Sequence, residues 1–133
     1  MANKLSSQDL IVEEWLKRAK DDELNAASIL KHKDGVPNGV CFLSQQMAEK
    51  YLKAFLVQEK RKYPKIHSLL KLTEICLEID KKFKEIKDDV IFLNAFYVPT
   101  RYPGDYLEFS WQEAKQAFEA ATRIKNFILS KMN

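Results

Sequence analysis

The chain is poor in the residues that make turns. It contains three glycines and four prolines in 133 residues, less than half of the roughly 12% that these residues contribute to an average protein. A sandwich or barrel of many short strands needs more turn residues, so the composition favours a mostly helical protein. The hydrophobic share of 46% and the charged share of 31% are those of an ordinary globular protein, and we expect one domain over residues 1–133.

Long hydrophobic runs are also absent. Lys, Glu or Gln interrupts each apolar segment every few residues, so no stretch approaches the roughly 20 residues that a membrane-spanning helix needs. The first ten residues hold no apolar signal core, which a secreted protein would carry there. We therefore expect a cytoplasmic protein that does not bind a membrane.

Cysteine and histidine are scarce, with two of each in the chain. Cys41 and Cys76 lie in apolar segments without a CxxC pair, which is typical of reduced core thiols. The two histidines are far apart, and the sequence contains no GxSxG, HExxH, P-loop or GxGxxG motif. We expect no metal site, no cofactor and no common hydrolase chemistry.

The spacing of apolar residues predicts an all-α protein, an antiparallel up-and-down bundle of four long helices and one short helix. Ser7 is the expected N-cap of the first helix, Ser68 that of the third, and Ser110 forms a capping box with Glu113 in the last. The second helix is apolar around most of its circumference and should lie at the centre. The expected helices span residues 8–32, 39–60, 68–79, 82–97 and 110–131.

A row of polar residues interrupts the apolar second helix. Gln45, Glu49 and Lys53 lie four residues apart, with Gln46 and Lys50 beside them, so all five share one narrow face. The row could face solvent, where a Glu49–Lys53 pair would add a few tenths of a kcal/mol. It could instead line a polar cleft.

Basic residues are concentrated between Lys50 and Lys71, where seven Lys or Arg accompany one acid, Glu59. The segment has a net charge of +6, whereas the whole chain has +3. Lysines at the end of a helix also interact favourably with its dipole, so part of the cluster has a structural explanation. A phosphate would be attracted here, and the helix that begins near Ser68 could add backbone N–H donors.

The loop from Tyr97 to Tyr106 combines three tyrosines, two prolines and one of the chain's four arginines in ten residues. Tyrosine rings stack on bases and arginine forks bind phosphate, so this composition suits a nucleotide. A loop that closes one end of a bundle would also use prolines and aromatic side chains. His67 is a further candidate, although a single His at a helix start commonly has a capping or packing role.

Three sequence blocks together resemble the HEPN domain, the higher eukaryotes and prokaryotes nucleotide-binding family. They are CFLSQQMAEKYLKA at 41–54, HSLLKL at 67–72 and YVPTRYPGD at 97–105, and the similarity extends over about residues 12–129. The resemblance implies a helical bundle that is often a homodimer. Small prokaryotic members are commonly encoded beside a minimal nucleotidyltransferase as a toxin–antitoxin pair.

Our leading hypothesis is a nucleotide-binding module that acts with a separately encoded nucleotidyltransferase and is not itself an enzyme. The cations would neutralise phosphate, tyrosine would stack on the base, His67 would hydrogen-bond phosphate or ribose, and Glu49 would orient Lys53. The expected nucleotide-binding residues are Gln46, Glu49, Lys50, Lys53, His67, Tyr97, Arg101 and Tyr102.

Two alternatives remain. The resemblance to the HEPN family also implies an alternative nuclease function, because other members are metal-independent ribonucleases that use an Arg and a His separated by four to six residues. In this chain five residues separate Arg61 from His67. His67 would then act as general acid or base in a dimer, with Arg61 or Arg101 stabilising charge on the scissile phosphate. The second alternative is a structural bundle that docks a partner through exposed aromatics such as Trp15, Trp111 or Tyr106.

Overall fold

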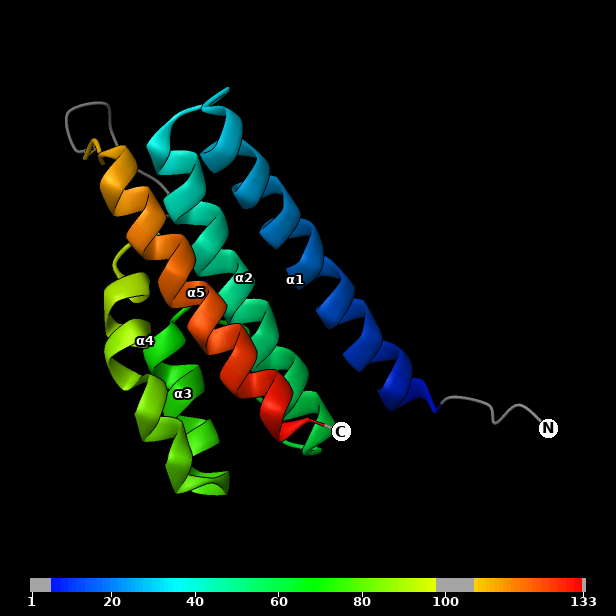
Figure 1. Cartoon of the computed structure of the whole chain (residues 1–133). Coiled ribbons are helices and arrows are strands. Elements are labelled where there is room, and N and C mark those ends of the chain that lie inside the picture. The colour runs from blue at the N-terminus through cyan, green and yellow to red at the C-terminus, as the bar shows by residue number, and fades with distance from the viewer. Residues whose placement is uncertain (1–5, 98–106, 133) are drawn as a thin grey trace.

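The protein is an antiparallel bundle of helices (Figure 1). A computed structural model describes residues 6–97 and 107–132, and this part of the chain is helical with no strand. The expectation of an all-α bundle is therefore confirmed. The elements are α1 (Ser7–His32), α2 (Pro37–Gln58), α3 (Leu69–Ile79), the 3₁₀-helix η1 (Lys81–Ile86), α4 (Lys87–Asn94) and α5 (Trp111–Lys131).

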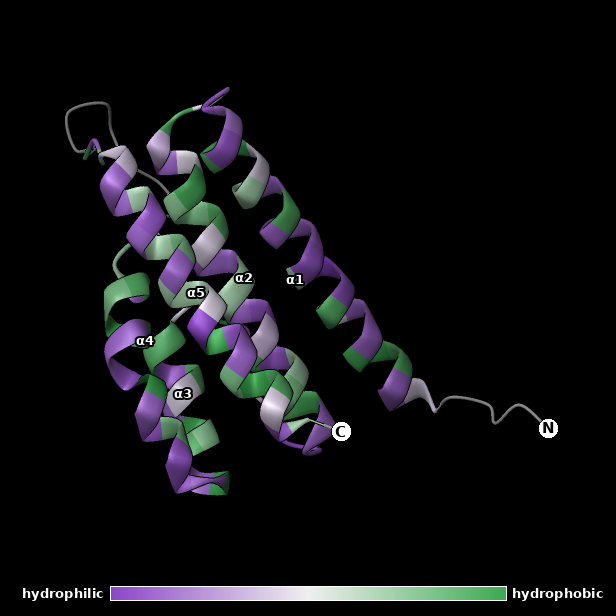
Figure 2. Ribbon diagram, viewed as in Figure 1, coloured by the Kyte–Doolittle hydropathy of each residue, from purple (hydrophilic) through white to green (hydrophobic). Residues whose placement is uncertain are grey.

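The central element is α2. It contacts α1, α3, α4 and α5, and 13 of its 22 residues are buried. Figure 1 shows α1 on one side of α2 and the pair α3 and α4 on the other, and α1 contacts only α2 and α5 among the described elements. Hydrophobic residues follow the length of α2 in Figure 2, whereas polar residues dominate the outer turns of α1. The prediction that the second helix lies at the centre of the bundle is confirmed. A helix covered on several sides must be apolar around most of its circumference, which is the pattern that its sequence shows.

Two ion pairs tie α1 to its neighbours. Lys50 of α2 binds Asp22, and Lys125 of α5 lies 2.7 Å from the Glu23 carboxylate. Burial alone would raise the pKa of Glu23, but its bonds with Lys125 and Lys20 outweigh burial and hold this pKa below its ordinary value. Glu23 therefore remains charged where α1 meets the bundle.

The helix boundaries follow local capping chemistry. Ser68 caps α3 and the Ser110–Glu113 capping box opens α5, both as expected. The N-cap of α1 is Ser6, not Ser7, because Asp9 three residues later completes a capping box with Ser6. The second helix begins at Pro37, two residues before the expected start, since a proline without N–H fits the first turn of a helix.

The fourth expected helix, residues 82–97, is two shorter elements. Its first turns form η1, in which Asp80 caps the backbone N–H of Lys82, and α4 then ends at Asn94. The 3₁₀ geometry places residues three apart on one side, so Phe83 and Ile86 are both buried. The bundle therefore contains three long helices, α3, and the broken η1–α4 segment.

Both cysteines are buried and unbridged. Burial raises the pKa of the Cys41 thiol to about 11 and that of Cys76 to about 12. The sequence-based expectation of reduced core thiols is confirmed.

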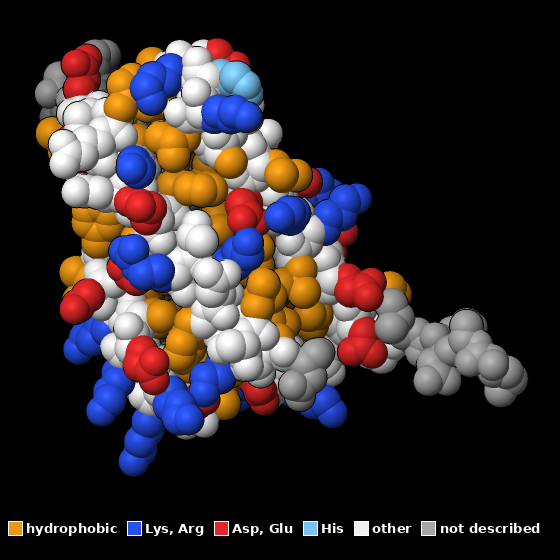
Figure 3. Space-filling model, viewed as in Figure 1, with side chains coloured by type: hydrophobic (Ala, Val, Ile, Leu, Met, Phe, Trp, Pro, Cys, Tyr) orange, Lys and Arg blue, Asp and Glu red, His pale blue; other side chains and the backbone are white. Residues whose placement is uncertain are grey.

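Surface charge alone does not mark a binding site on the face shown in Figure 3. Figure 3 shows acidic and basic side chains intermixed on one face, with hydrophobic side chains between them. Within residues 6–97 and 107–132, no group of three or more His, Cys, Asp or Glu is arranged to hold a metal ion. No helix in the same residues has the length and apolar character to span a membrane.

Candidate functional site

The polar row of α2 lies inside the protein. Gln45 is fully buried, and the exposed fractions of Glu49 and Lys53 are 3% and 6%. The Lys53 ammonium lies 2.9 Å from a Glu49 carboxylate oxygen. The interpretation of this row as a solvent-facing face is therefore wrong. An ion pair at this depth carries a desolvation cost that surface pairs avoid.

Glu49 also holds His67. The Nδ1 atom of His67 lies 3.2 and 3.1 Å from the two Glu49 carboxylate oxygens. For this hydrogen bond Nδ1 must carry the proton, so in the neutral ring Nε2 is an acceptor. The His67 side chain is 48% exposed. A buried carboxylate thus fixes the orientation of an imidazole that reaches the surface.

The rest of the row fixes the chain just before α3. The Gln45 side-chain amide donates to the backbone carbonyl of His67 at 3.1 Å, and Gln46 donates to the side-chain oxygen of Gln45 at 2.7 Å. Gln45 and Glu49, which lie one helical turn apart on α2, therefore both bind His67. This explains why polar residues interrupt the core helix at these positions.

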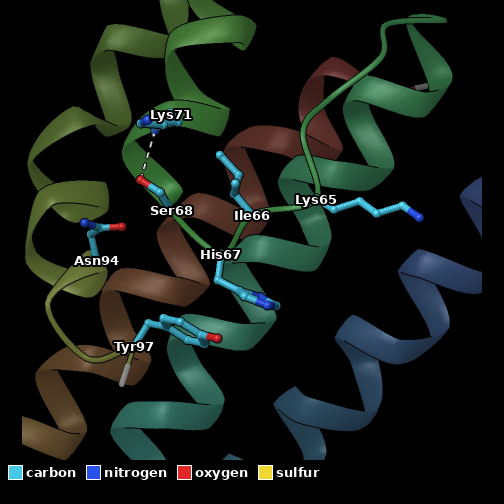
Figure 4. A pocket seen from close by; sticks show the side chains of 7 residues that line it. All are labelled: Lys65, Ile66, His67, Ser68, Lys71, Asn94 and Tyr97. Carbon is cyan, nitrogen blue, oxygen red and sulfur yellow. Dashed lines mark hydrogen bonds between the residues drawn. The ribbon is translucent and has the colours of Figure 1, made fainter. Parts of the chain in front are cut away.

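Tyr97 completes the support of His67 from the end of the α4 segment. Its ring stacks on the imidazole with centroids 4.5 Å apart and an interplanar angle of 24°. Figure 4 shows the two rings side by side. His67 is thereby held between Glu49 of α2 and Tyr97, which lies after α4.

A pocket of about 570 Å³ opens beside His67 (Figure 4). We call it the Lys71 pocket. Lys65 and Lys71 are exposed, and no carboxylate in the described ranges 6–97 and 107–132 pairs with either. The pocket therefore concentrates positive charge and hydrogen-bond donors. Its lining residues are Lys65, Ile66, His67, Ser68, Lys71, Asn94 and Tyr97.

The first backbone amides of α3 are largely satisfied within the protein. The Leu69 N–H donates to the side-chain oxygen of Asn94 at 2.8 Å, and the Lys71 N–H donates to Ser68 Oγ at 3.3 Å. The N–H groups of Leu69 and Lys71 are therefore not the free donors that the sequence analysis expected at this helix start. The side-chain oxygen of Asn94 thus holds the start of α3 in place.

A second pocket of about 540 Å³ also has His67 in its lining. We call it the Trp15 pocket. The Lys53 ammonium lies 5.2 Å from the ring centroid of Trp15 and 5.7 Å from that of Tyr63. The two pockets share Lys65 and His67, and we call them together the His67 groove. The Trp15 pocket is lined by Trp15, Lys53, Lys62, Tyr63, Lys65 and His67.

The structure brings together four of the residues predicted for the site. Glu49, Lys53, His67 and Tyr97 meet at the His67 groove or directly beneath it. Arg101 and Tyr102 lie outside the described residues.

Three other predicted residues do not line the groove. Gln46 supports Gln45, and Lys50 is paired with Asp22 of α1. Arg61 lies 2.7 Å from the Glu78 carboxylate of α3 and lines neither pocket. The sequence spacing between Arg61 and His67 therefore does not place the guanidinium beside the imidazole.

Sequence reasoning missed Asn94 and Tyr63 and assigned Trp15 to partner docking. Asn94 is a polar residue between apolar positions of a helix, which was an available signal. Tyr63 lies inside the basic cluster and beside a proline, a context that also suits a plain loop. Trp15 follows the apolar stripe of α1, so only its three-dimensional neighbours reveal its place at a pocket.

The fold and the groove define a helical protein with a basic site, and comparison with known proteins identifies its family. The HEPN domain matches residues 12–132, and the chain belongs to the HEPN family. This family is a helical nucleotide-binding and ribonuclease-like group whose members are often dimeric. No curated protein matches the chain.

Two solved structures share the fold. ST0689, an archaeal HEPN homologue, is 27% identical, with a TM-score of 0.70, and the match covers 92% of this chain and 98% of that one. TT1696 from Thermus thermophilus is 25% identical, with a TM-score of 0.75 and coverages of 91% and 98%. The bundle is therefore similar to these proteins over nearly its whole length.

Proposed function

We propose that this protein is a nucleotide-binding module and that the His67 groove receives the phosphate. The observation that carries the proposal is the position of Lys65 and Lys71 on either side of an imidazole held by a buried carboxylate. Figure 4 shows the two lysines on different sides of His67. Charge-assisted hydrogen bonds to phosphate are stronger than neutral ones.

The groove supplies donors in several geometries. Ser68 offers a hydroxyl at the pocket, and the lysines offer ammonium groups that rotate to meet phosphate oxygens. His67 becomes a donor at Nε2 when the imidazole is protonated. These groups suit an anion with several acceptor oxygens.

Lys53 has a different role from the one that its sequence position indicates. Its ammonium is paired with Glu49, so the pair has no net charge. Phosphate neutralisation therefore falls to Lys65 and Lys71, and Arg101 remains a predicted contributor from the family resemblance.

Titration with ATP and GTP by isothermal calorimetry tests the proposal. We expect Lys65→Ala/Lys71→Ala to weaken binding by about tenfold or more, because each lysine provides a charge-assisted bond. The matched control is Lys81→Ala/Lys84→Ala, which removes the same charge from exposed positions of η1. Equal losses in both variants, or no binding to the unaltered protein, would contradict the proposal.

We further propose that the protein works as a homodimer with a separately encoded nucleotidyltransferase, as one half of a toxin–antitoxin pair. The support is membership of the HEPN family, whose members are often dimeric. Light scattering of the purified protein tests the dimer. Copurification with a nucleotidyltransferase encoded next to its gene tests the partnership, and growth arrest that this partner relieves tests the toxin role.

A second candidate function is a metal-independent endoribonuclease. The observation that favours it is the Glu49–His67 hydrogen bond, since a carboxylate that orients an imidazole is a common general-base arrangement. RNA cleavage in the presence of a chelator, abolished by His67→Ala and Arg101→Ala, would support this function. If Arg61→Ala also abolished cleavage, Arg61 would have to break its ion pair with Glu78 in order to reach the RNA. A folded dimer that leaves RNA intact would exclude it.

A further inference from the structure

We propose that the Trp15 pocket binds a nucleobase with adjacent acceptor atoms, as in guanine, in preference to adenine. The inference rests on the proposed nucleotide binding and adds the base-recognition part of the same groove. Three residues carry it: Trp15 of α1, Lys53 of α2 and Tyr63 of the segment before α3.

The aromatic side chains supply a surface for the base. Trp15 and Tyr63 are both partly exposed at the pocket, and their ring centroids lie 6.5 Å apart at an interplanar angle of 68°. The two rings meet edge to face, so they form the side of a pocket instead of packing flat on each other. Planar bases bind to aromatic surfaces of this kind by stacking, whatever their hydrogen-bonding pattern.

Lys53 supplies the discrimination. Lys53 lines the pocket and is 6% exposed, and its ammonium has three N–H donors. One donor is directed to Glu49, and the other described neighbours of the ammonium are the rings of Trp15 and Tyr63. The ring faces attract this cation, but they provide no lone pair for its N–H donors. A bound base that presents acceptors to Lys53 would give these donors charge-assisted hydrogen bonds.

Guanine fits this requirement better than adenine. Its O6 and N7 atoms are neighbouring acceptors, the pair that Lys and Arg contact most often in base recognition. Adenine places an amino donor beside N7, so that donor would face the Lys53 ammonium. The pocket therefore selects against adenine as well as for guanine.

One nucleotide can use both parts of the groove. Lys65 and His67 line both pockets, so the two pockets adjoin at these side chains. With the base on Trp15 and Tyr63, the ribose lies near His67 and the phosphates lie toward Lys71. This arrangement assigns a different part of the ligand to each pocket.

The first experiment compares GTP and ATP by calorimetry and by tryptophan fluorescence. The chain has two tryptophans, so Trp111→Phe leaves Trp15 as the only one, and Trp111 lines neither pocket. We expect about tenfold tighter binding of GTP than of ATP, and quenching of Trp15 emission by GTP. In Trp15→Phe, GTP should leave the emission of Trp111 unchanged.

The second experiment removes the donor. In Lys53→Met the preference for GTP should fall from about tenfold to less than about twofold, because the ammonium that distinguishes the bases is gone. The matched control is Lys50→Met on the same helix, whose side chain binds Asp22 outside the groove. It should keep the preference. The fluorescence measurement on Trp111→Phe does not depend on Lys53→Met being folded.

The outcomes separate the two proposals. If GTP and ATP bind equally and neither changes Trp15 emission, the base site is wrong and phosphate binding stands. A preference for GTP that survives in folded Lys53→Met would also overturn the assigned role of Lys53. If no nucleotide binds, the proposed function is wrong and the base site with it.

Discussion

At the scale of single residues, Glu49 connects the core of the bundle with its groove. One of its carboxylate oxygens accepts from both the Lys53 ammonium and the His67 ring. Glu49 is 3% exposed, so Lys53 and His67 contact its carboxylate where water would bind an exposed one. Stability and site geometry therefore depend on the same side chain.

Replacing Glu49 with Gln should lower the free energy of unfolding by about 3 kcal/mol, because the buried Lys53 loses its counter-charge. Urea unfolding followed by circular dichroism measures this change. Glu78→Gln is the control, since its pair with Arg61 is exposed on both sides and should contribute less than about 1 kcal/mol. Similar effects of the two substitutions would contradict a buried pair.

A double-mutant cycle measures the coupling directly. Glu49→Gln/Lys53→Met removes both charges, so it should destabilise the protein by less than the sum of the single substitutions. Additive effects would show that the two side chains do not interact, contrary to the 2.9 Å separation of their charged atoms.

At the scale of elements, the helices begin where side chains satisfy their first amides. The capping box of α5 pairs the Ser110 hydroxyl with the Glu113 N–H at 3.0 Å, and the Glu113 carboxylate with the Ser110 N–H at 3.0 Å. The helix that follows buries Ala114, Ala117 and Ile124 against the bundle. The start of α5 thus depends on residues 110–113, so it could be predicted from the local sequence.

Removing the cap tests this conclusion. Ser110→Ala should lower the free energy of unfolding by about 1 kcal/mol, because the Glu113 N–H loses its acceptor. Chemical denaturation provides the value. Gln116→Ala, at an exposed position of the same helix, should change stability by no more than a few tenths of a kcal/mol. A Ser110→Ala variant as stable as this control would contradict the capping role.

At the scale of the whole molecule, closure around α2 buries ionisable groups in their neutral forms. Burial raises the pKa of Cys41 to about 11, of Cys76 to about 12 and of Tyr51 to about 12. Nearby Glu113 adds to the effect on Cys41, and Glu23 to that on Tyr51. All three groups therefore keep their protons in the folded protein well into the alkaline range.

This burial predicts a loss of stability at high pH. Unfolded thiols lose their protons near pH 9, whereas the folded thiols remain protonated to about 11 and 12. Their contribution is thus complete below about pH 8 and is lost as the pH rises, by about 1 kcal/mol per thiol at pH 10. Urea unfolding at pH 8 and pH 10 measures this loss.

The control for the alkaline loss is Cys41→Ala/Cys76→Ala. The decrease between pH 8 and pH 10 should be smaller by about 2 kcal/mol in this variant, because the groups that titrate are gone. An equal decrease in both proteins would mean that other groups cause it.

The local parts of the fold could be predicted, and the boundaries that depend on packing could not. Ser68 and Ser110 were recognised as caps because an N-cap and its acceptor partner lie within one turn. The break of the fourth segment at Ile86 was missed because a continuous stripe of apolar residues fits either kind of helix. The choice between them depends on how Phe83 packs against Phe55 and Phe127.

The sequence by itself determined the helical class, the central place of α2 and the buried, reduced thiols, because periodicity and composition act along the chain. Only the tertiary structure decided what the polar row does. The distance of Glu49 from His67 depends on how the segment before α3 packs against α2, and sequence spacing does not report it. For the same reason Arg61 faces Glu78, while Trp15, Tyr63 and Asn94 come to the groove from separate elements.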